Sequence, residues 1–236
     1  MVPARDASTV VVVRPDGNRG FQILLTQRPA QMRFLGGYYV FPGGTVRSED
    51  YSPNVLERCL GLSADDAGKM LGRQHAPEEA LGHWTAVIRE LFEEVGVLLC
   101  VAESGDGIDL RDEPTKKRLE VKRRAIANKE LDFGAFLDSE NFFCDLSRIV
   151  YFDHWVTPEI YSMRFDTRFY MAALPANQIP LTCSEEVTHS LWVNSQEIVS
   201  RAYRQDLAIL PPTTTVLQKL AQFDSWARLR AAFALR

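Results

Sequence analysis

The most informative stretch of this sequence is residues 87–96, which read Val-Ile-Arg-Glu-Leu-Phe-Glu-Glu-Val-Gly. At about 100° per residue, a helix gathers the apolar side chains of this stretch in an arc of about 140° and the charged ones opposite them. The apolar face is typical of a helix packed on a core, where each fully buried side chain contributes roughly 1.5–3 kcal/mol. We therefore expect a helix from Pro77 to Val95, closed by Gly96, with one face buried and the charged face in solvent.

Three carboxylates, those of Glu90, Glu93 and Glu94, share the charged face. Residues three and four apart on a helix lie within about 6 Å at Cβ, so these like charges repel one another. One arginine, Arg89, does not neutralise three glutamates, which points to a bound cation. Hard divalent cations such as Mg²⁺ or Mn²⁺ take oxygen ligands of this kind. The alternative is an acidic surface helix in which Arg89 pairs with Glu93 across one turn.

Strand and turn patterns surround this helix. Residues 8–14 and 21–28 are apolar runs joined by turn residues, and they predict a β-hairpin. Residues 38–41 predict a short strand that ends in the turn Pro42-Gly43-Gly44, whose backbone groups can approach a ligand. Further strands are expected at 97–102, 149–156, 167–174 and 187–193, and helices at 116–129, 194–203 and 213–236. This order favours a mixed sheet with helices on its faces.

Composition and charge narrow the classes of function that the sequence allows. The chain has 236 residues, 46% hydrophobic and 25% charged, with a formal net charge of −4. These values are typical of a globular protein and exclude a disordered, collagen-like or coiled-coil chain. They indicate no basic surface for duplex nucleic acid or an anionic membrane, so a small ligand is the first expectation. We expect an intracellular, cytoplasmic protein, because the sequence shows neither a signal peptide core nor a transmembrane run of about 20 apolar residues.

The other chemistry-bearing residues are interpreted as structural. The four cysteines lack the paired spacing of a zinc site and are expected to be reduced and mostly buried. The histidines also lack metal-ligand spacing along the chain; they are His75, His83, His154 and His189. The basic stretch 116–129 is expected to form a solvated helix face.

Together, these motifs resemble the Nudix hydrolase superfamily, whose box is Gly-x5-Glu-x7-Arg-Glu-U-x-Glu-Glu-x-Gly-U, with U aliphatic. Residues 89–97 match every fixed position of its second half. The first half begins at Gly44, and Asp50 stands where the box has its first glutamate. Residues 45–88 number 44 where the box has 13, so 31 extra residues interrupt it.

The sequence before the box is similar to one branch of that superfamily. Residues 24–44 resemble the additional motif of coenzyme A diphosphatases, Leu-Leu-Thr-x-Arg-Ser/Ala-x3-Arg-x3-Gly-x3-Phe-Pro-Gly-Gly, and only Pro29 departs from it. Residues 155–158 and 164–170 resemble a subgroup of this branch that carries a long insertion inside the box. The resemblance covers about residues 8–220.

The resemblance implies an α/β fold, a Nudix-type α/β/α sandwich with a mixed sheet and helical insertions. We expect a single domain over residues 1–236, with one insertion at about 51–76 and a helical insertion at about 111–146. Loop-closure entropy grows only with the logarithm of loop length, so tens of extra residues cost on the order of 1–2 kcal/mol. The first insertion is therefore expected to be a surface excursion that leaves the metal site intact.

The resemblance also implies roles for individual residues. The expected metal ligands are Glu90, Glu93, Glu94 and the carbonyl oxygen of Gly44. Arg89 is expected to orient the glutamates by a salt bridge. The general base is expected to be a box glutamate or a glutamate of a later loop, where the candidates are Glu185 and Glu186.

Substrate binding is assigned to residues of the motif before the box. The expected residues are Arg28, Arg33, Tyr39 and Phe41, because guanidinium groups suit phosphate and aromatic rings can stack on an adenine. Tyr38 and Phe169 are further candidates for stacking. The alternative for the aromatic side chains is packing in the core, and for the arginines a role in surface solubility.

The activity that the resemblance implies is metal-dependent hydrolysis of a diphosphate linkage, in which water attacks one phosphorus. The leading substrate is coenzyme A or an acyl-coenzyme A, which would give 3′,5′-ADP and a 4′-phosphopantetheine. A diphosphatase for NADH or ADP-ribose is the second hypothesis, and a nucleotide-sensing module without catalysis is the third. The expected partner is a small nucleotide-containing molecule, not a nucleic acid or a membrane, and a homodimer is left open.

Overall fold

The computed structural model describes residues 2–17, 20–32, 34–72, 74–204 and 206–236. Its strands are β1 (Arg5–Asp16), β2 (Gly20–Gln27), β3 (Tyr39–Val40), β4 (Gly43–Thr45), β5 (Cys59–Leu60), β6 (Cys100–Ala102), β7 (Phe142–Asp145), β8 (Val150–Val156), β9 (Phe165–Ala173) and β10 (His189–Val193). The helices are α1 (Pro53–Leu56), α2 (Ala64–Leu71), α3 (Pro77–Val95), α4 (Glu113–Ala127), α5 (Phe133–Glu140), α6 (Ser195–Tyr203), α7 (Pro211–Leu220) and α8 (Trp226–Phe233). Two 3-10 turns, η1 (Ser48–Tyr51) and η2 (Leu146–Arg148), complete the elements.

A mixed seven-stranded sheet lies at the centre of the molecule, with the order β10-β2-β1-β9-β8. The short strands β3 and β4 extend it beside β2 and β1. The predicted hairpin is confirmed, because β1 and β2 pair antiparallel, with Val13 opposite Ile23. β1 and β9 run parallel along their lengths, so β1 is hydrogen-bonded on both edges.

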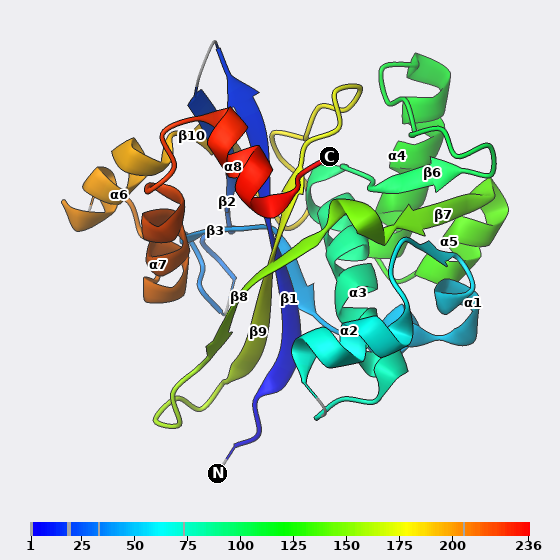
Figure 1. Cartoon of the computed structure of the whole chain (residues 1–236), viewed down its shortest axis with the longest axis horizontal. Coiled ribbons are helices and arrows are strands. Elements are labelled where there is room, and N and C mark those ends of the chain that lie inside the picture. The colour runs from blue at the N-terminus through cyan, green and yellow to red at the C-terminus, as the bar shows by residue number, and fades with distance from the viewer. Residues whose placement is uncertain (1, 18–19, 33, 73, 205) are drawn as a thin grey trace.

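Two helical layers cover the central sheet. Successive side chains of a strand point to opposite faces, and β1 supplies both layers in this way. Val10 and Val12 pack in the core that contains α3, whereas Val11 and Val13 pack in the core that contains α7 and α8. Figure 1 shows α2 to α5 on one side of the sheet and α6 and α7 on the other, and Leu229 of α8 packs in the same core as α7. The predicted α/β/α sandwich is confirmed.

A second sheet was not predicted. It has three strands in the order β5-β7-β6, and it joins the segment around residue 59 to that around residue 143. Its strands have two to four residues, too short for an alternating pattern to be recognised. Cys59, Cys144 and Cys100 lie opposite one another across it. All four cysteines are free thiols, and the fourth, Cys183, is exposed.

Three further expectations need correction. The segment 213–236 forms two helices, because the hydroxyl of Ser225 accepts a hydrogen bond from the backbone N–H of Arg228 and begins α8. Gly43 and Gly44 lie in strand β4, which pairs with β1, and not in a free turn. The stretch 51–76 is not a surface excursion, since its Val55 and Ala67 are fully buried in the core beside α3. Apolar residues of the insertion thus contribute to the main core.

Within the described ranges, none of the helices combines the length and the apolarity that a membrane span requires.

Candidate active site

Helix α3 carries the charged residues of the candidate site. Pro77 occupies its first turn, the side chain of Glu79 accepts a hydrogen bond from the N–H of Ala76, and Gly96 closes the helix with a φ of 70°. That positive φ suits glycine, which has no Cβ. The helix therefore begins and ends where the sequence predicts.

The charged face of α3 is buried, so the expectation that it lies in solvent is wrong. The exposed fraction is 5% for Glu90, 5% for Glu93, 4% for Glu94 and 2% for Arg89. Strand β4 and the turn η1 pack against α3 and cover this face. Periodicity in the sequence separates the two faces of the helix, but it does not show what covers the polar one.

Asp50 and Arg89 form the fixed centre of the site. The Nε and Nη2 atoms of Arg89 donate to the two carboxylate oxygens of Asp50 over 2.6 and 2.8 Å. Such a two-point contact is strong and sets the orientation of the guanidinium group. The Nη1 atom donates to Oε1 of Glu90 over 2.6 Å and to Oε1 of Glu93 over 3.0 Å. Arg89 thus holds two glutamates, and the aspartate in the box holds Arg89.

The two glycines of β4 allow close contact between the backbone and the glutamates. The N–H of Gly43 donates to Oε2 of Glu94 over 3.3 Å, at a φ of 152° for Gly43. A Cβ atom at position 44 would lie 2.4 Å from Oε1 of Glu90, closer than any side chain tolerates. Glycine at position 44 is therefore required for Glu90 to lie where it does.

The electrostatics of this cluster are strongly perturbed. Burial raises the pKa of Glu94 well above its usual value, and the charges of Glu90 and Glu186 add to this effect. Burial also raises the pKa of Glu90, which Arg89 opposes. Desolvated carboxylates of this kind are unfavourable unless they are paired or bind a cation.

The donor set fits a divalent cation. Besides Arg89, only Arg47 contacts the glutamates in an ion pair among the described residues, at 3.5 Å from Glu93 and 3.8 Å from Glu90. Four carboxylates, with that of Asp50, thus face two guanidinium groups, which leaves two negative charges when all four carboxylates are ionised. The three glutamates do not all bring an oxygen within 4.8 Å of one another, so as they stand they do not all reach one ion. Mg²⁺ takes few protein ligands and keeps positions for water and phosphate, so a partial set of oxygen donors fits it.

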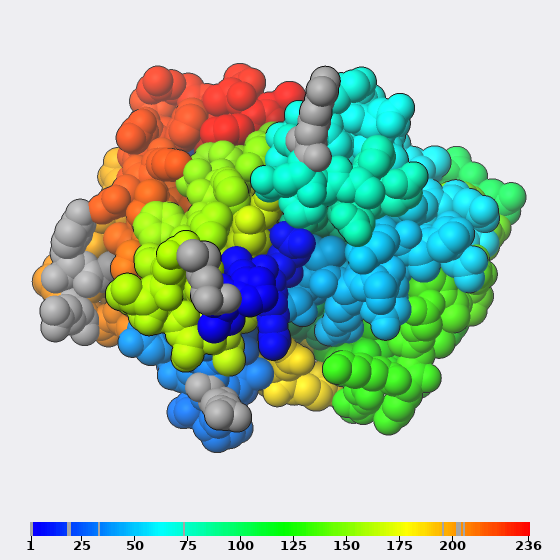
Figure 2. All heavy atoms as spheres, turned by 90° about the horizontal axis from the view of Figure 1, so that it is seen from below, coloured from blue at the N-terminus to red at the C-terminus, as the bar shows by residue number. Residues whose placement is uncertain are grey.

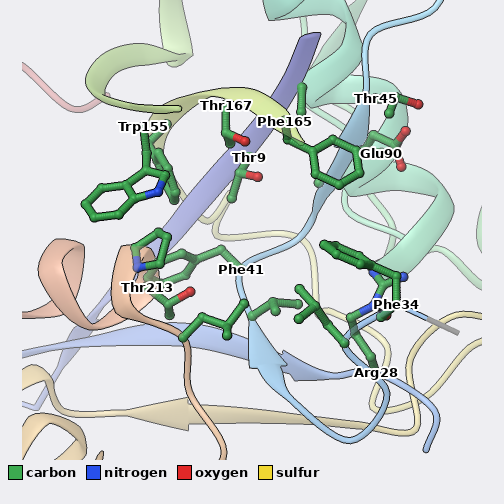
Figure 3. A pocket seen from close by; sticks show the side chains of 18 of the residues that line it. Thr9, Arg28, Phe34, Phe41, Thr45, Glu90, Trp155, Phe165, Thr167 and Thr213 are labelled. Atoms are coloured by element: carbon green, nitrogen blue, oxygen red, sulfur yellow. Dashed lines mark hydrogen bonds between the residues drawn. The ribbon is translucent and has the colours of Figure 1, made fainter. Parts of the chain in front are cut away.

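A pocket of about 350 Å³ opens beside the cluster. Its charged lining residues are Arg28, Arg47, Glu90 and Glu186. Its aromatic lining residues are Phe34, Phe41, Trp155, Phe165 and Phe169. Figure 3 shows Glu90 and Arg28 on one side of the pocket and Trp155 on the opposite side. The charged side chains Glu90 and Arg28 therefore mark one end of the pocket, which Phe34 and Phe165 share, and Trp155 lies at the other end.

Several residues predicted from the sequence meet at this pocket. Gly44, Glu90, Glu186 and Arg28 line it, and so do Phe41 and Phe169. The rings of Phe41 and Phe169 are 6.4 Å apart and nearly perpendicular. Tyr39, by contrast, is not a lining residue and packs against the core on the side of α7. Arg33 lies outside the described residues.

The structure distinguishes the two glutamates of the later loop. The carboxylate of Glu185 accepts hydrogen bonds from Arg123 over 3.0 Å, whereas Glu186 lines the pocket. Arg123 is only 2% exposed and also donates to the carbonyl oxygen of Glu93 over 2.5 Å. The basic stretch 116–129 is therefore not a purely solvated face, because one of its arginines binds the C-terminal turn of α3.

Some lining residues were missed from the sequence. Arg47 lies three residues after Gly44, inside the first half of the box, and this position was the available signal. Trp155 and Phe165 lie in stretches that were noted only for their resemblance to a subgroup. Phe34 stands at a variable position of the motif over residues 24–44, and in the pocket its ring packs 5.2 Å from that of Phe165.

The mixed sheet between helical layers, with a glutamate-rich helix facing a Gly-Gly strand, places the chain in the Nudix hydrolase class. A family model described as NUDT19 Nudix domain matches residues 4–220. The chain therefore belongs to the NUDT19-type Nudix family.

This chain is similar to named proteins in its sequence and to a solved structure in its fold. Acyl-coenzyme A diphosphatase NUDT19 of Xenopus laevis is 26% identical over 230 residues, which cover 86% of this chain and 60% of that protein. The human protein of the same name is 26% identical over 249 residues, which cover 92% of this chain and 64% of that protein. The chain thus spans less than two thirds of the length of these relatives. The crystal structure of a NUDIX hydrolase from Alicyclobacillus acidocaldarius has a TM-score of 0.79 at 24% identity, covers 98% of this chain and 97% of its own, and supports the fold.

Proposed function

We propose that this chain hydrolyses the diphosphate linkage of coenzyme A or an acyl-coenzyme A with Mg²⁺ or Mn²⁺. The products would be 3′,5′-ADP and 4′-phosphopantetheine or its acyl derivative. The observation that carries this proposal is a pocket that joins the buried glutamate cluster to an aromatic wall. The relatives described above are named acyl-coenzyme A diphosphatases, which supports the same substrate class.

The two ends of the pocket suit the two kinds of group in such a substrate. Arg28 and Arg47 line the charged end, and guanidinium groups bind phosphate oxygens in pairs. Phe34, Phe165 and Trp155 offer apolar area for an adenine ring or for a pantetheine or acyl chain. We assign the diphosphate to the charged end for this reason.

Glu90, Glu93, Glu94 and the carbonyl oxygen of Gly44 would hold the cation, because they are the buried oxygen donors at this end. When bound, Mg²⁺ or Mn²⁺ supplies positive charge to the phosphate oxygens and lowers the pKa of a coordinated water. Arg89, fixed by Asp50, keeps Glu90 and Glu93 in their orientation.

The chemical step is the attack of water on one phosphorus of the diphosphate. A bond forms between the water oxygen and phosphorus, and the bond from that phosphorus to the bridging oxygen breaks. Glu186 is our candidate for the group that accepts the proton of the water, since it lines the pocket and its charge acts on Glu94. Glu185 is not a candidate for this role, because Arg123 holds its carboxylate.

The test is a substrate panel of coenzyme A, an acyl-coenzyme A, ADP-ribose and NADH, with Mg²⁺, Mn²⁺ or EDTA and products identified by mass. We expect cleavage of the two coenzyme A compounds to 3′,5′-ADP in either metal and none in EDTA. Rapid turnover of ADP-ribose without turnover of coenzyme A would overturn the assignment of coenzyme A as the substrate and favour ADP-ribose. No turnover of any compound, with binding retained, would favour a sensing module.

A further inference from the structure

A second cluster of ionisable side chains lies nearer the N-terminal end of α3. Asp6 of β1, His75 just before α3, and His83 of α3 bring one ligand atom each within 4.8 Å of one another. A cavity of about 110 Å³ opens beside them, and Glu79 also lines it. We propose that this cluster binds one divalent metal ion of the Zn²⁺ kind. This ion would be distinct from the cation at the glutamate site.

The donor types favour such an ion over Mg²⁺. Two imidazoles and one carboxylate are ligands that Zn²⁺ commonly takes, at nitrogen and oxygen distances near 2 Å. Mg²⁺ prefers oxygen ligands and keeps its waters. The rings of His75 and His83 lie 5.3 Å apart at an interplanar angle of 70°. Both rings therefore face the same small space without stacking on each other.

Ser8 holds His83 in the orientation that a ligand needs. Nδ1 of His83 lies 3.0 Å from Oγ of Ser8, and both residues are buried. With Nδ1–H donating to this hydroxyl, the lone pair of Nε2 faces Asp6, whose Oδ1 is 3.9 Å away. Histidines that bind metals typically donate their other ring N–H to such a partner, which fixes the ring.

The surrounding charges leave room for a divalent cation. Arg168 lies 3.1 Å from Nε2 of His75 and 3.7 Å from Oδ1 of Asp6. It is itself paired with Asp166, which also binds His154 over 2.5 Å. The carboxylates of Asp6, Glu79 and Asp166 outnumber this one guanidinium by two. A metal on Nε2 of His75 would replace the hydrogen bond from Arg168, which keeps its contact with Asp166.

The position of the cluster indicates a structural role. The cavity is lined by Val46 just before the insertion, by Tyr51 at its start and by His75 at its end. Figure 2 shows the blue N-terminal strand lying against the cyan residues of the insertion. A bound ion would therefore cross-link β1, the end of the insertion and α3. His83 and Glu90 are seven residues apart, about 10 Å along the helix, so this ion would not touch a substrate at the glutamates.

The histidines were interpreted as structural because their spacing along the sequence is not that of ligands. The spacing is set instead by the fold, since β1 brings Asp6 beside α3. Sequence periodicity could relate only Glu79 and His83, four residues apart on one helix face.

The test uses Co²⁺ as a spectroscopic substitute for Zn²⁺, added to the full chain in a large excess of Mg²⁺. The excess of Mg²⁺ saturates the oxygen-only glutamate site, so Co²⁺ reports on the histidine site. We expect one Co²⁺ per chain, visible absorption bands typical of nitrogen ligation, and displacement by Zn²⁺. His75→Ala should weaken binding by about 10-fold or more, while His189→Ala, which changes an exposed histidine of β10, should leave it unchanged.

A second measurement keeps the test independent of variant stability. Zn²⁺ should raise the midpoint of thermal unfolding of the unaltered chain and of His189→Ala, but not of Asp6→Asn or His75→Ala. Far-UV circular dichroism shows whether the variants are folded. Absence of Co²⁺ binding by the unaltered chain overturns the proposal. An unchanged Co²⁺ spectrum in folded His75→Ala, or an equal thermal shift in all four proteins, overturns it as well.

Discussion

The two ionisable clusters of α3 differ in their donors, their charges and their origin. The glutamate cluster comes from two turns of one helix, has only oxygen donors, and borders the large pocket. The histidine cluster combines nitrogen and oxygen donors from three segments and borders a small cavity at the base of the insertion. Arginines separate the glutamates, whereas the histidine cluster is compact. The two proposals thus assign catalysis to one end of a single helix and cross-linking of the fold to the region near its other end.

The largest expected effect comes from removing the arginine that holds the glutamates. Arg89→Met would leave the buried carboxylates of Asp50, Glu90 and Glu93 without their shared partner. Breaking a buried pair in this way costs about 3–5 kcal/mol of the free energy of unfolding. Urea unfolding measures this, with Arg111→Met, at an exposed ion pair, as the control that should not shift the midpoint. Equal midpoints for the two variants would contradict the role of Arg89.

The next effect concerns catalysis at the glutamate cluster alone. Glu93→Gln keeps the size and one hydrogen-bond acceptor but removes a charge, so metal-dependent hydrolysis should fall by about 100-fold or more. Glu130→Gln, at an exposed position, is the matched control and should keep its rate. If the clusters are independent, Co²⁺ binding in excess Mg²⁺ should be the same in both variants. A normal rate in Glu93→Gln would remove Glu93 from the metal ligands.

A smaller effect is expected at the glycine strand. The Cβ of Gly44→Ala would displace the carboxylate of Glu90, which lies 2.4 Å from that position. The Mg²⁺ concentration needed for half-maximal rate should rise by about 10-fold. Gly107→Ala is the control, because no atom lies within 4 Å of its Cβ position. A Gly44→Ala variant with unaltered Mg²⁺ dependence would show that Glu90 adapts without loss.

The smallest expected effect comes from metal removal, which should distinguish the functions of the two clusters without changing any residue. After treatment with EDTA and dialysis, Mg²⁺ should restore hydrolysis but leave the midpoint of thermal unfolding lowered by a few degrees. Zn²⁺ should then restore the midpoint. Recovery of both properties with Mg²⁺ alone would mean that the histidine cluster has no separate ion.

Much of the candidate site follows from local sequence. The i, i+3, i+4 spacing of Glu90, Glu93 and Glu94 and the ends of α3 were predicted, because a helix turns short-range spacing into a common face. The β1–β2 hairpin was predicted for a similar reason, since its turn residues and apolar runs are neighbours in the chain. The predicted sandwich depended further on the resemblance of residues 24–44 and 89–97 to a known family.

Tertiary structure alone decided what covers each of these faces. The burial of the glutamates depends on β4 and η1, the pairing of Cys59 with Cys144 joins two distant segments, and the separation of Glu185 from Glu186 depends on Arg123. The meeting of Asp6, His75 and His83 is of the same kind. Periodicity reports the direction of a side chain relative to its own helix or strand. The partner it meets is set by the packing of segments far apart in the chain, and no local spacing encodes that packing.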